Sequence, residues 1–255
     1  MRKNILLKLK YDGNEFAGLQ IQPGQRTVQG EIEKVLSKIA GEKIRIEPTS
    51  RTDSGVHAIC QCATFQWDVN LPTEKLKYVL NNSFSKRQNK FRILSDIEIL
   101  SAVEVPEDFH ARFSAKGKTY RYIIYNAKEY DIFRRNYSYE IKEDLDFESM
   151  KNACSYFIGE HDFKSFEASG SNPRETTVRT ITDISIERVD DDIVIEVTGN
   201  KFLYNMVRII VGTLVEVGMG RKQPEDIKKI IKAKNRNAAG HTAPPQGLYL
   251  LEIYY

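Results

Sequence analysis

An aspartate in a short turn is the first residue of this sequence that could do chemistry. The segment Ser50-Arg51-Thr52-Asp53-Ser54-Gly55-Val56-His57-Ala58 leads from a turn-forming Asp-Ser-Gly into an alternating apolar run. A carboxylate presented in this way can attack a substrate as a nucleophile and leave again, which divides a difficult step into two easier ones. Asp-Ser-Gly also occurs in ordinary turns, where the aspartate accepts hydrogen bonds from nearby backbone. The local pattern alone favours that structural interpretation.

Tyrosines and basic residues share a second candidate segment, Lys116-Gly117-Lys118-Thr119-Tyr120-Arg121-Tyr122. Successive side chains of a β-strand point to opposite faces, so Tyr120 and Tyr122 share one face and Arg121 lies on the other. Such a strand is either an aromatic core strand or a surface on which an extruded base stacks while cations bind phosphate. Spacing alone favours the core strand.

A single arginine interrupts a third segment, the mostly apolar run from Phe202 to Val217. Its pattern predicts a buried helix in which Arg208 shares a face with Lys201, Tyr204, Asn205, Val211 and Gly212. A buried arginine needs a carboxylate or phosphate partner, because an unpaired charge is costly in a protein interior. The alternative is a side chain that reaches the surface by snorkelling. We favour the paired arginine, and we expect Gly212 to leave room for another backbone.

The elements that must position these residues are a mixture of strands and helices without a strict alternation, which indicates an α+β fold. Expected strands cover residues 4–11, 56–67, 91–105, 118–125, 178–189, 193–198 and 248–255. Expected helices run from a cap at Thr27 to Gly41, start at 72–73, and cover 147–158, 202–217 and 224–234. A boundary at Val105-Pro106-Glu107-Asp108 would divide the chain into residues 1–105, with the aspartate turn, and residues 106–255, with the tyrosine strand and arginine helix.

Composition excludes several classes of protein. The chain has 255 residues and a formal net charge of +3, which is weak evidence for a nucleic-acid partner. Its apolar runs are interrupted by charges, so we expect no signal peptide, no membrane contact and a cytoplasmic location. Three cysteines give no disulfide framework, and Cys60-x-Cys62 reads as two half-buried strand residues. There is no phosphate-binding glycine loop and no convincing set of metal ligands, so we expect neither cofactor nor metal.

Motifs in a fixed order along nearly the whole chain resemble the tRNA pseudouridine synthase A family. They include the Asp53 segment, Tyr120-Arg121-Tyr122 and Phe202-Leu203-Tyr204-Asn205-Met206-Val207-Arg208. The others are Tyr11-Asp12-Gly13, Gly18-Leu19-Gln20-Ile21-Gln22-Pro23, Arg26-Thr27-Val28-Gln29, Phe109-His110-Ala111-Arg112-Phe113-Ser114-Ala115, His161-Asp162-Phe163, Val178-Arg179-Thr180-Ile181 and Thr242-Ala243-Pro244-Pro245-Gln246-Gly247-Leu248. Their joint order makes a chance resemblance untenable.

The resemblance implies a fold and a reaction. The fold would be that of the pseudouridine synthases: two similar α/β halves, each a mainly antiparallel sheet flanked by helices, packed around a central RNA-binding cleft. The reaction would convert uridines 38, 39 and 40 of the tRNA anticodon stem-loop to pseudouridine without a cofactor. The uracil leaves the ribose through its N-glycosidic bond, rotates, and reattaches through carbon. The family also implies a homodimer that binds tRNA.

Four residues take roles by this resemblance. Asp53 corresponds to the family nucleophile, which attacks either the sugar or the base. Arg208 would form an ion pair that keeps Asp53 ionised, since burial alone raises the pKa of a carboxyl group. Tyr120 would stack on the target base and could transfer a proton. Arg51 would bind RNA and help displace the nucleotide from its stack. This chemistry does not need a histidine, so we expect a structural role for His57.

Two departures and two alternatives remain open at this point. Leu19 stands where the family usually has Trp, and Ser50 where it usually has Gly, which could change how the Asp53 turn bends. A hydrolase could use Asp53 on the same glycosidic bond and release free uracil, although no second carboxylate lies near it in sequence. A non-catalytic RNA-binding module or tRNA chaperone is the alternative from another class.

Overall fold

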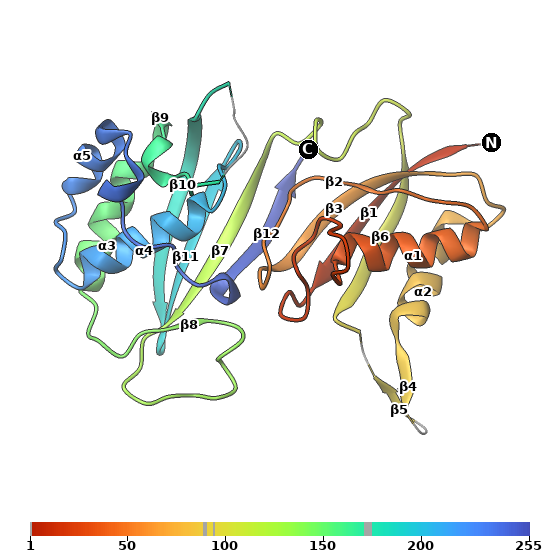
Figure 1. Cartoon of the computed structure of the whole chain (residues 1–255), viewed down its shortest axis with the longest axis horizontal. Coiled ribbons are helices and arrows are strands. Elements are labelled where there is room, and N and C mark those ends of the chain that lie inside the picture. Colours follow the sequence, from red (N-terminus) through yellow and green to blue (C-terminus); the bar gives the residue numbers. More distant parts are fainter. Residues whose placement is uncertain (1, 89–90, 94, 171–174) are drawn as a thin grey trace. The chain divides into compact units, whose positions relative to one another are not determined.

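The computed structural model describes residues 2–88, 91–93, 95–170 and 175–255. The chain forms two compact units, which Figure 1 shows in sequence colours. Unit 1 contains the chain up to Lys116 together with Leu250–Tyr255, and unit 2 contains Gly117–Tyr249. Unit 1 therefore extends beyond the boundary expected after Val105, and it also includes residues 250–255 from the other end of the sequence.

Unit 1 is built on strands in the order β6-β1-β3-β12, in which β1 pairs antiparallel with both β6 and β3. Their bounds are Ile97–Val105 for β6, Lys3–Tyr11 for β1, His57–Trp67 for β3 and Leu248–Tyr254 for β12. A short strand β2 (Glu47–Pro48) pairs antiparallel with β3, and β4 (Lys86–Gln88) pairs with β5 (Phe91–Ile93). The stretch expected as strand over 91–105 is thus two strands, and residue 94 lies outside the described residues.

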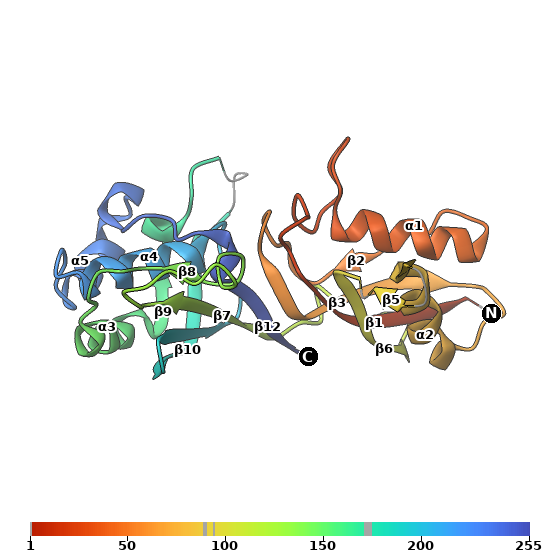
Figure 2. The same ribbon diagram turned by 90° about the horizontal axis from the view of Figure 1, so that it is seen from below.

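Two helices bury their apolar sides in unit 1, and Figure 2 shows α1 lying along its strands. Helix α1 (Val28–Ala40) begins as expected, because the Thr27 side chain accepts a hydrogen bond from the amide of Gly30. It ends at Gly41, which has the left-handed φ of 73° that glycine adopts at no steric cost. Helix α2 (Thr73–Phe84) buries Leu76 and Leu80.

Unit 2 is built on antiparallel strands in the order β7-β11-β10-β9. Their bounds are Gly117–Tyr125 for β7, Asp192–Gly199 for β11, Val178–Val189 for β10 and Gly159–Asp162 for β9. A short strand β8 (Tyr139–Glu140) pairs parallel with β7. Strands β10 and β11, both expected from the sequence, form a hairpin, and its turn contains Asp190 at a φ of 52°.

Three helices gather beside the strands of unit 2, where Figure 1 shows them in green and blue. They are α3 (Phe147–Cys154), α4 (Met206–Gly218) and α5 (Asp226–Ala233). In α4, eleven of the thirteen residues are buried, as its apolar pattern predicts. Each unit therefore combines mainly antiparallel strands with helices, which confirms the expected α+β class. In the described part of the chain no helix is long and apolar enough to cross a membrane.

The start of α4 is later than expected. The sequence pattern predicted a helix from Phe202, but the helix begins at Met206 because Asn205 adopts a left-handed φ of 58°. Tertiary contacts hold the preceding residues out of the helix: the carbonyl of Tyr204 accepts from the amide of Ala168 at 3.1 Å. The expectation that Lys201 and Tyr204 share a helical face with Arg208 is therefore wrong.

Candidate active site

Asp53 lies in a turn that leads directly into β3. The amide of Val56 donates to the Asp53 carbonyl at 3.2 Å, and Gly55 has a φ of 78° that favours glycine. The Asp53 side chain is half-buried, whereas Arg51 is exposed. The sequence pattern thus located the turn correctly, and it presents a carboxylate and a guanidinium two residues apart.

A separate segment, residues 11–19, holds this turn in place. The Tyr11 hydroxyl and Thr52 Oγ1 form a buried hydrogen bond of 2.7 Å, and the amide of Leu19 donates to the Thr52 carbonyl at 3.1 Å. The Ser54 hydroxyl donates to the Phe16 carbonyl at 3.1 Å. The residues on both sides of Asp53 are therefore fixed by a chain segment more than thirty residues away.

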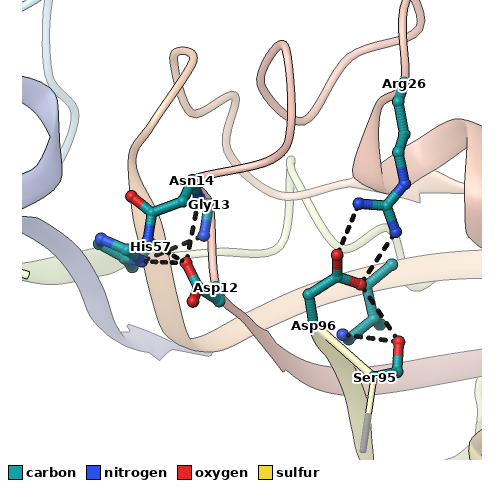
Figure 3. Close-up of polar contacts among 8 residues, drawn as sticks. Asp12, Gly13, Asn14, Arg26, His57, Ser95 and Asp96 are labelled. Carbon is teal, nitrogen blue, oxygen red and sulfur yellow. Dashed lines mark hydrogen bonds and ion pairs between the residues drawn. The ribbon is translucent and has the colours of Figure 1, made fainter. Parts of the chain in front are cut away.

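Gly13 brings that segment into contact with Val56 and His57, and Figure 3 shows the polar contacts at His57. A Cβ atom at Gly13 would lie 2.1 Å from the carbonyl oxygen of Val56, so only glycine fits. The Gly13 amide donates to Nδ1 of His57 at 3.1 Å, and the carboxylate of Asp12 lies 3.3 Å from the same nitrogen. His57 is 2% exposed. These contacts connect His57 to the backbone that holds the Asp53 turn.

An ion pair between Arg26 and Asp96 also supports the segment of residues 11–19 (Figure 3). Arg26 binds Asp96 through two hydrogen bonds of 2.5 and 3.0 Å, and its guanidinium lies 4.2 Å from the centre of the Phe16 ring. The amide of Asp12 donates to the Asp96 carbonyl at 2.9 Å. Partial burial raises the pKa of Asp96, but the hydrogen bond and charge of Arg26 outweigh it, so the pKa is lowered. Sequence analysis missed Asp96, because nothing local marks a carboxylate that pairs seventy residues away.

Tyr120 and Tyr122 share the buried face of β7, as the alternation predicted. The ring of Tyr120 packs edge-on against Phe202, with ring centres 5.0 Å apart. The Tyr122 hydroxyl donates to the carbonyl of Pro244 at 2.7 Å. Gly247 closes this contact, since a Cβ atom there would lie 2.6 Å from the Tyr122 ring. The Thr242–Leu248 motif therefore packs against the tyrosine strand of unit 2.

Arg208 projects from the first turns of α4 and is half-buried. Its Nε donates to the Ala243 carbonyl at 2.7 Å, and its Nη1 donates to Oδ1 of Asn205 at 2.8 Å. These two bonds fix the plane of the guanidinium. Gly212 leaves room for the chain close to Ala243. A Cβ atom at Gly212 would lie 1.9 Å from the carbonyl oxygen of His241, which confirms the expected approach of another backbone.

The charge of Arg208 acts on the tyrosine strand. Burial raises the pKa of Tyr122 well above its usual value, and the nearby Arg208 charge opposes that rise. Tyr122 therefore stays a neutral hydrogen-bond donor. Over the described residues, no three His, Cys, Asp or Glu side chains are grouped so that they could hold a metal ion. Cys60 and Cys62 both lie on β3 as expected, but only Cys60 is half-buried, whereas Cys62 is fully buried.

Comparison with known proteins gives consistent matches. The sequence pattern of the tRNA pseudouridine synthase family matches residues 9–114 and 153–255. The protein named tRNA pseudouridine synthase A from Acetivibrio thermocellus is 46% identical over 99% of this chain and 100% of its own length. Its namesake from Halalkalibacterium halodurans is 47% identical over 96% of this chain and 90% of its own.

A solved structure is a weaker match. The structure titled "Crystal Structure of a Cbf5-Nop10-Gar1 Complex" has a TM-score of 0.34 and 12% identity, over 82% of this chain and 54% of that one. The matches to the tRNA pseudouridine synthase family and to its two named members do not depend on this structure. They cover the segments that carry Asp53, Arg208 and the glycine contacts around them.

Proposed function

This chain belongs to the tRNA pseudouridine synthase family, and we propose that it isomerises uridines 38, 39 and 40 of the tRNA anticodon stem-loop with Asp53 as the nucleophile. The observation that carries the proposal is the construction of the Asp53 turn. Hydrogen bonds at Thr52, Ser54 and Val56 hold the backbone on both sides of the carboxylate. A nucleophile held in this way needs little reorganisation when it attacks, which favours catalysis.

Asp53 supplies the covalent step of the reaction. Its carboxylate bonds to the nucleotide while the N-glycosidic bond breaks, and the uracil then turns and reattaches through carbon as the carboxylate leaves. Nothing is oxidised or reduced in this isomerisation. A bond from the sugar to C5 of uracil replaces the bond to N1, so the proton on C5 is removed and N1 ends with a proton. Tyr120 is the candidate group for this proton transfer.

Three further residues assist Asp53 in this proposal. In this proposal Arg208 supplies a positive charge that keeps the Asp53 carboxylate ionised. Its bonds to Ala243 and Asn205 fix the plane of the guanidinium within unit 2. Tyr120 stacks on the target uracil, and its edge contact with Phe202 fixes the angle of the ring. Arg51, which is exposed beside the turn, binds RNA and helps displace the nucleotide.

The partner in this proposal is tRNA bound by a homodimer. RNA of this form is recognised mainly through its shape and backbone, which fits an enzyme that accepts three neighbouring positions. The segment between β7 and β8 exposes apolar side chains, with Phe133 81% exposed and Ile132 52% exposed. Exposed apolar groups of this kind mark contacts between proteins, so they support a second copy as the partner. A tRNA substrate also agrees with the expected cytoplasmic location.

The test is modification of unmodified tRNA that carries uridine at positions 38–40, with no added cofactor. We expect pseudouridine at those positions with the wild type and none with Asp53→Ala, while Asp53→Ala still binds the tRNA. Free uracil in place of pseudouridine would assign a hydrolase. Full activity of Asp53→Ala would refute Asp53 as the nucleophile, and binding without any product from the wild type would favour a chaperone.

A further inference from the structure

Residues 106–116 form an ordered loop that the reaction does not use. Three hydrogen bonds from the Asn4 side chain reach the carbonyls of Pro106, Glu107 and Phe109 at 2.9, 3.5 and 2.8 Å. At the other end, the Lys116 amide donates to the Tyr254 carbonyl at 2.8 Å. The loop is therefore fixed to unit 1 at both ends.

His110 organises the middle of this loop. Its Nδ1 accepts from the amides of Arg112 and Phe113 at 3.0 and 3.4 Å, so the ring proton sits on Nε2. Nε2 lies 2.5 Å from the carboxylate of Glu47, to which it donates. Ser114 closes the turn, because its amide donates to the His110 carbonyl at 2.9 Å and its hydroxyl accepts from the His110 amide at 3.1 Å.

This ordered loop presents an aromatic ring to solvent. Phe113 is 77% exposed, although its ring centre lies 4.3 Å from that of His110. The guanidinium of Arg112 lies 5.7 Å from the centre of the Phe113 ring, and Arg112 is itself exposed. Burial of Phe113 therefore does not stabilise the loop. The hydrogen bonds of His110 and Asn4 stabilise it, and they hold the ring outward.

We propose that Phe113 and Arg112 form a second RNA contact, in which the Phe113 ring stacks on an unpaired base and Arg112 binds a neighbouring phosphate. Aromatic rings beside cations are the common means of holding single-stranded RNA, because every base has a π-face and every nucleotide a negative charge. A contact with protein would need further apolar side chains around the ring. Here the side chains in contact with the Phe113 ring are those of His110 and Arg112, and both are polar. The inference rests on the proposed function, since it requires a bound RNA.

The experiment measures the Kd of unmodified tRNA, and its KM in pseudouridine formation, for full-length variants. Phe113→Ala should raise Kd by about 5- to 100-fold, the range of one base–aromatic stack. Phe113→Leu should lose as much, because it keeps an apolar side chain without a π-face, whereas Phe113→Trp should bind as the wild type does. Tyr78→Ala is the matched control, since Tyr78 is 67% exposed on α2 and should leave Kd unchanged.

The dependence on salt separates the two residues. Arg112→Gln should reduce the slope of log Kd against log salt concentration by about one phosphate contact, while Phe113→Ala leaves the slope unchanged. A Kd within twofold of the wild type for Phe113→Ala, or full binding by Phe113→Leu, overturns the inference. So does a Phe113→Ala variant that changes oligomeric state but not Kd. A wild type that makes no pseudouridine and binds no tRNA overturns the proposed function instead.

Discussion

Substitution of Gly13 by alanine should disable the enzyme without unfolding it. The new Cβ atom would start 2.1 Å from the Val56 carbonyl oxygen, and Cβ atoms essentially never come closer than 3.0 Å to such a neighbour. The backbones at Gly13 and Val56 must therefore separate by about 1 Å. Overpacking of this size typically costs about 1–3 kcal/mol of stability. A folded domain of this size tolerates that loss.

The effect on catalysis should be larger than the effect on stability. The Val56 amide is bonded to the Asp53 carbonyl, so a displaced Val56 moves the Asp53 turn, in which we propose the nucleophile lies. A displacement of 1 Å at a reacting group costs about a hundredfold in rate. We therefore expect kcat for pseudouridine formation to fall by about two orders of magnitude, with a smaller change in KM.

The matched control is Gly24→Ala. Gly24 lies in the same unit at a φ of 71°, and a Cβ atom there would have no neighbour within 4 Å. That substitution introduces only left-handed backbone strain, about 1–2 kcal/mol, and should leave kcat unchanged. Single-turnover rates and urea unfolding of both variants provide the measurement. If Gly13→Ala shows the same urea unfolding transition as the wild type and keeps the wild-type kcat, the glycine contact does not position Asp53.

Three other predictions follow from the same contacts. Tyr11→Phe removes the buried hydrogen bond to Thr52, so it should lower the free energy of unfolding by about 1–3 kcal/mol. The double variant with Thr52→Val should lose less than the sum of the two single-variant losses. Additive losses in urea unfolding would contradict a direct bond. Because the pKa of Asp96 is lowered in the folded state, its pairing with Arg26 should stabilise the protein near neutral pH. The stability difference from Asp96→Asn should then shrink as pH falls through the acid range, and a difference independent of pH would count against the pair. A hydrogen bond from Cys62 lowers the pKa of Cys60 to about 7, so iodoacetamide at neutral pH should label Cys60 before the other two cysteines, as peptide mass analysis can check.

The sequence predicted those elements whose ends are set locally. Thr27 and Gly41 delimit α1 through bonds to their own neighbours, and both were identified from residue type. The start of α4 was predicted incorrectly, because the conformation of Asn205 depends on contacts made by a distant segment at Ala168. Residue periodicity contains no information on such a partner.

The candidate site also has a part that the sequence predicts and a part that it does not. The Asp53 turn can be predicted from Asp-Ser-Gly and its motif, since the turn is built from adjacent residues. Its supports cannot, because Tyr11 and Phe16 reach it only after the strands have paired, and Asp96 acts only through Asp12 and Arg26. Gly13 illustrates the limit: the sequence shows a glycine in a turn, and only the fold shows the carbonyl that excludes a side chain there.

The return of β12 to unit 1 has a consequence for the order of events during synthesis. Unit 1 is completed by Leu250–Tyr255, which are translated after the whole of unit 2. Tyr255 bonds to Thr49 at 2.9 Å, just ahead of the Asp53 turn, and packs against Phe109. At about 5–20 residues per second, the ribosome needs on the order of ten seconds to make the intervening stretch. During that interval a nascent chain has the Asp53 turn and β3 but not the neighbouring strand β12, so unit 1 should depend on the last translated residues before it is fully folded.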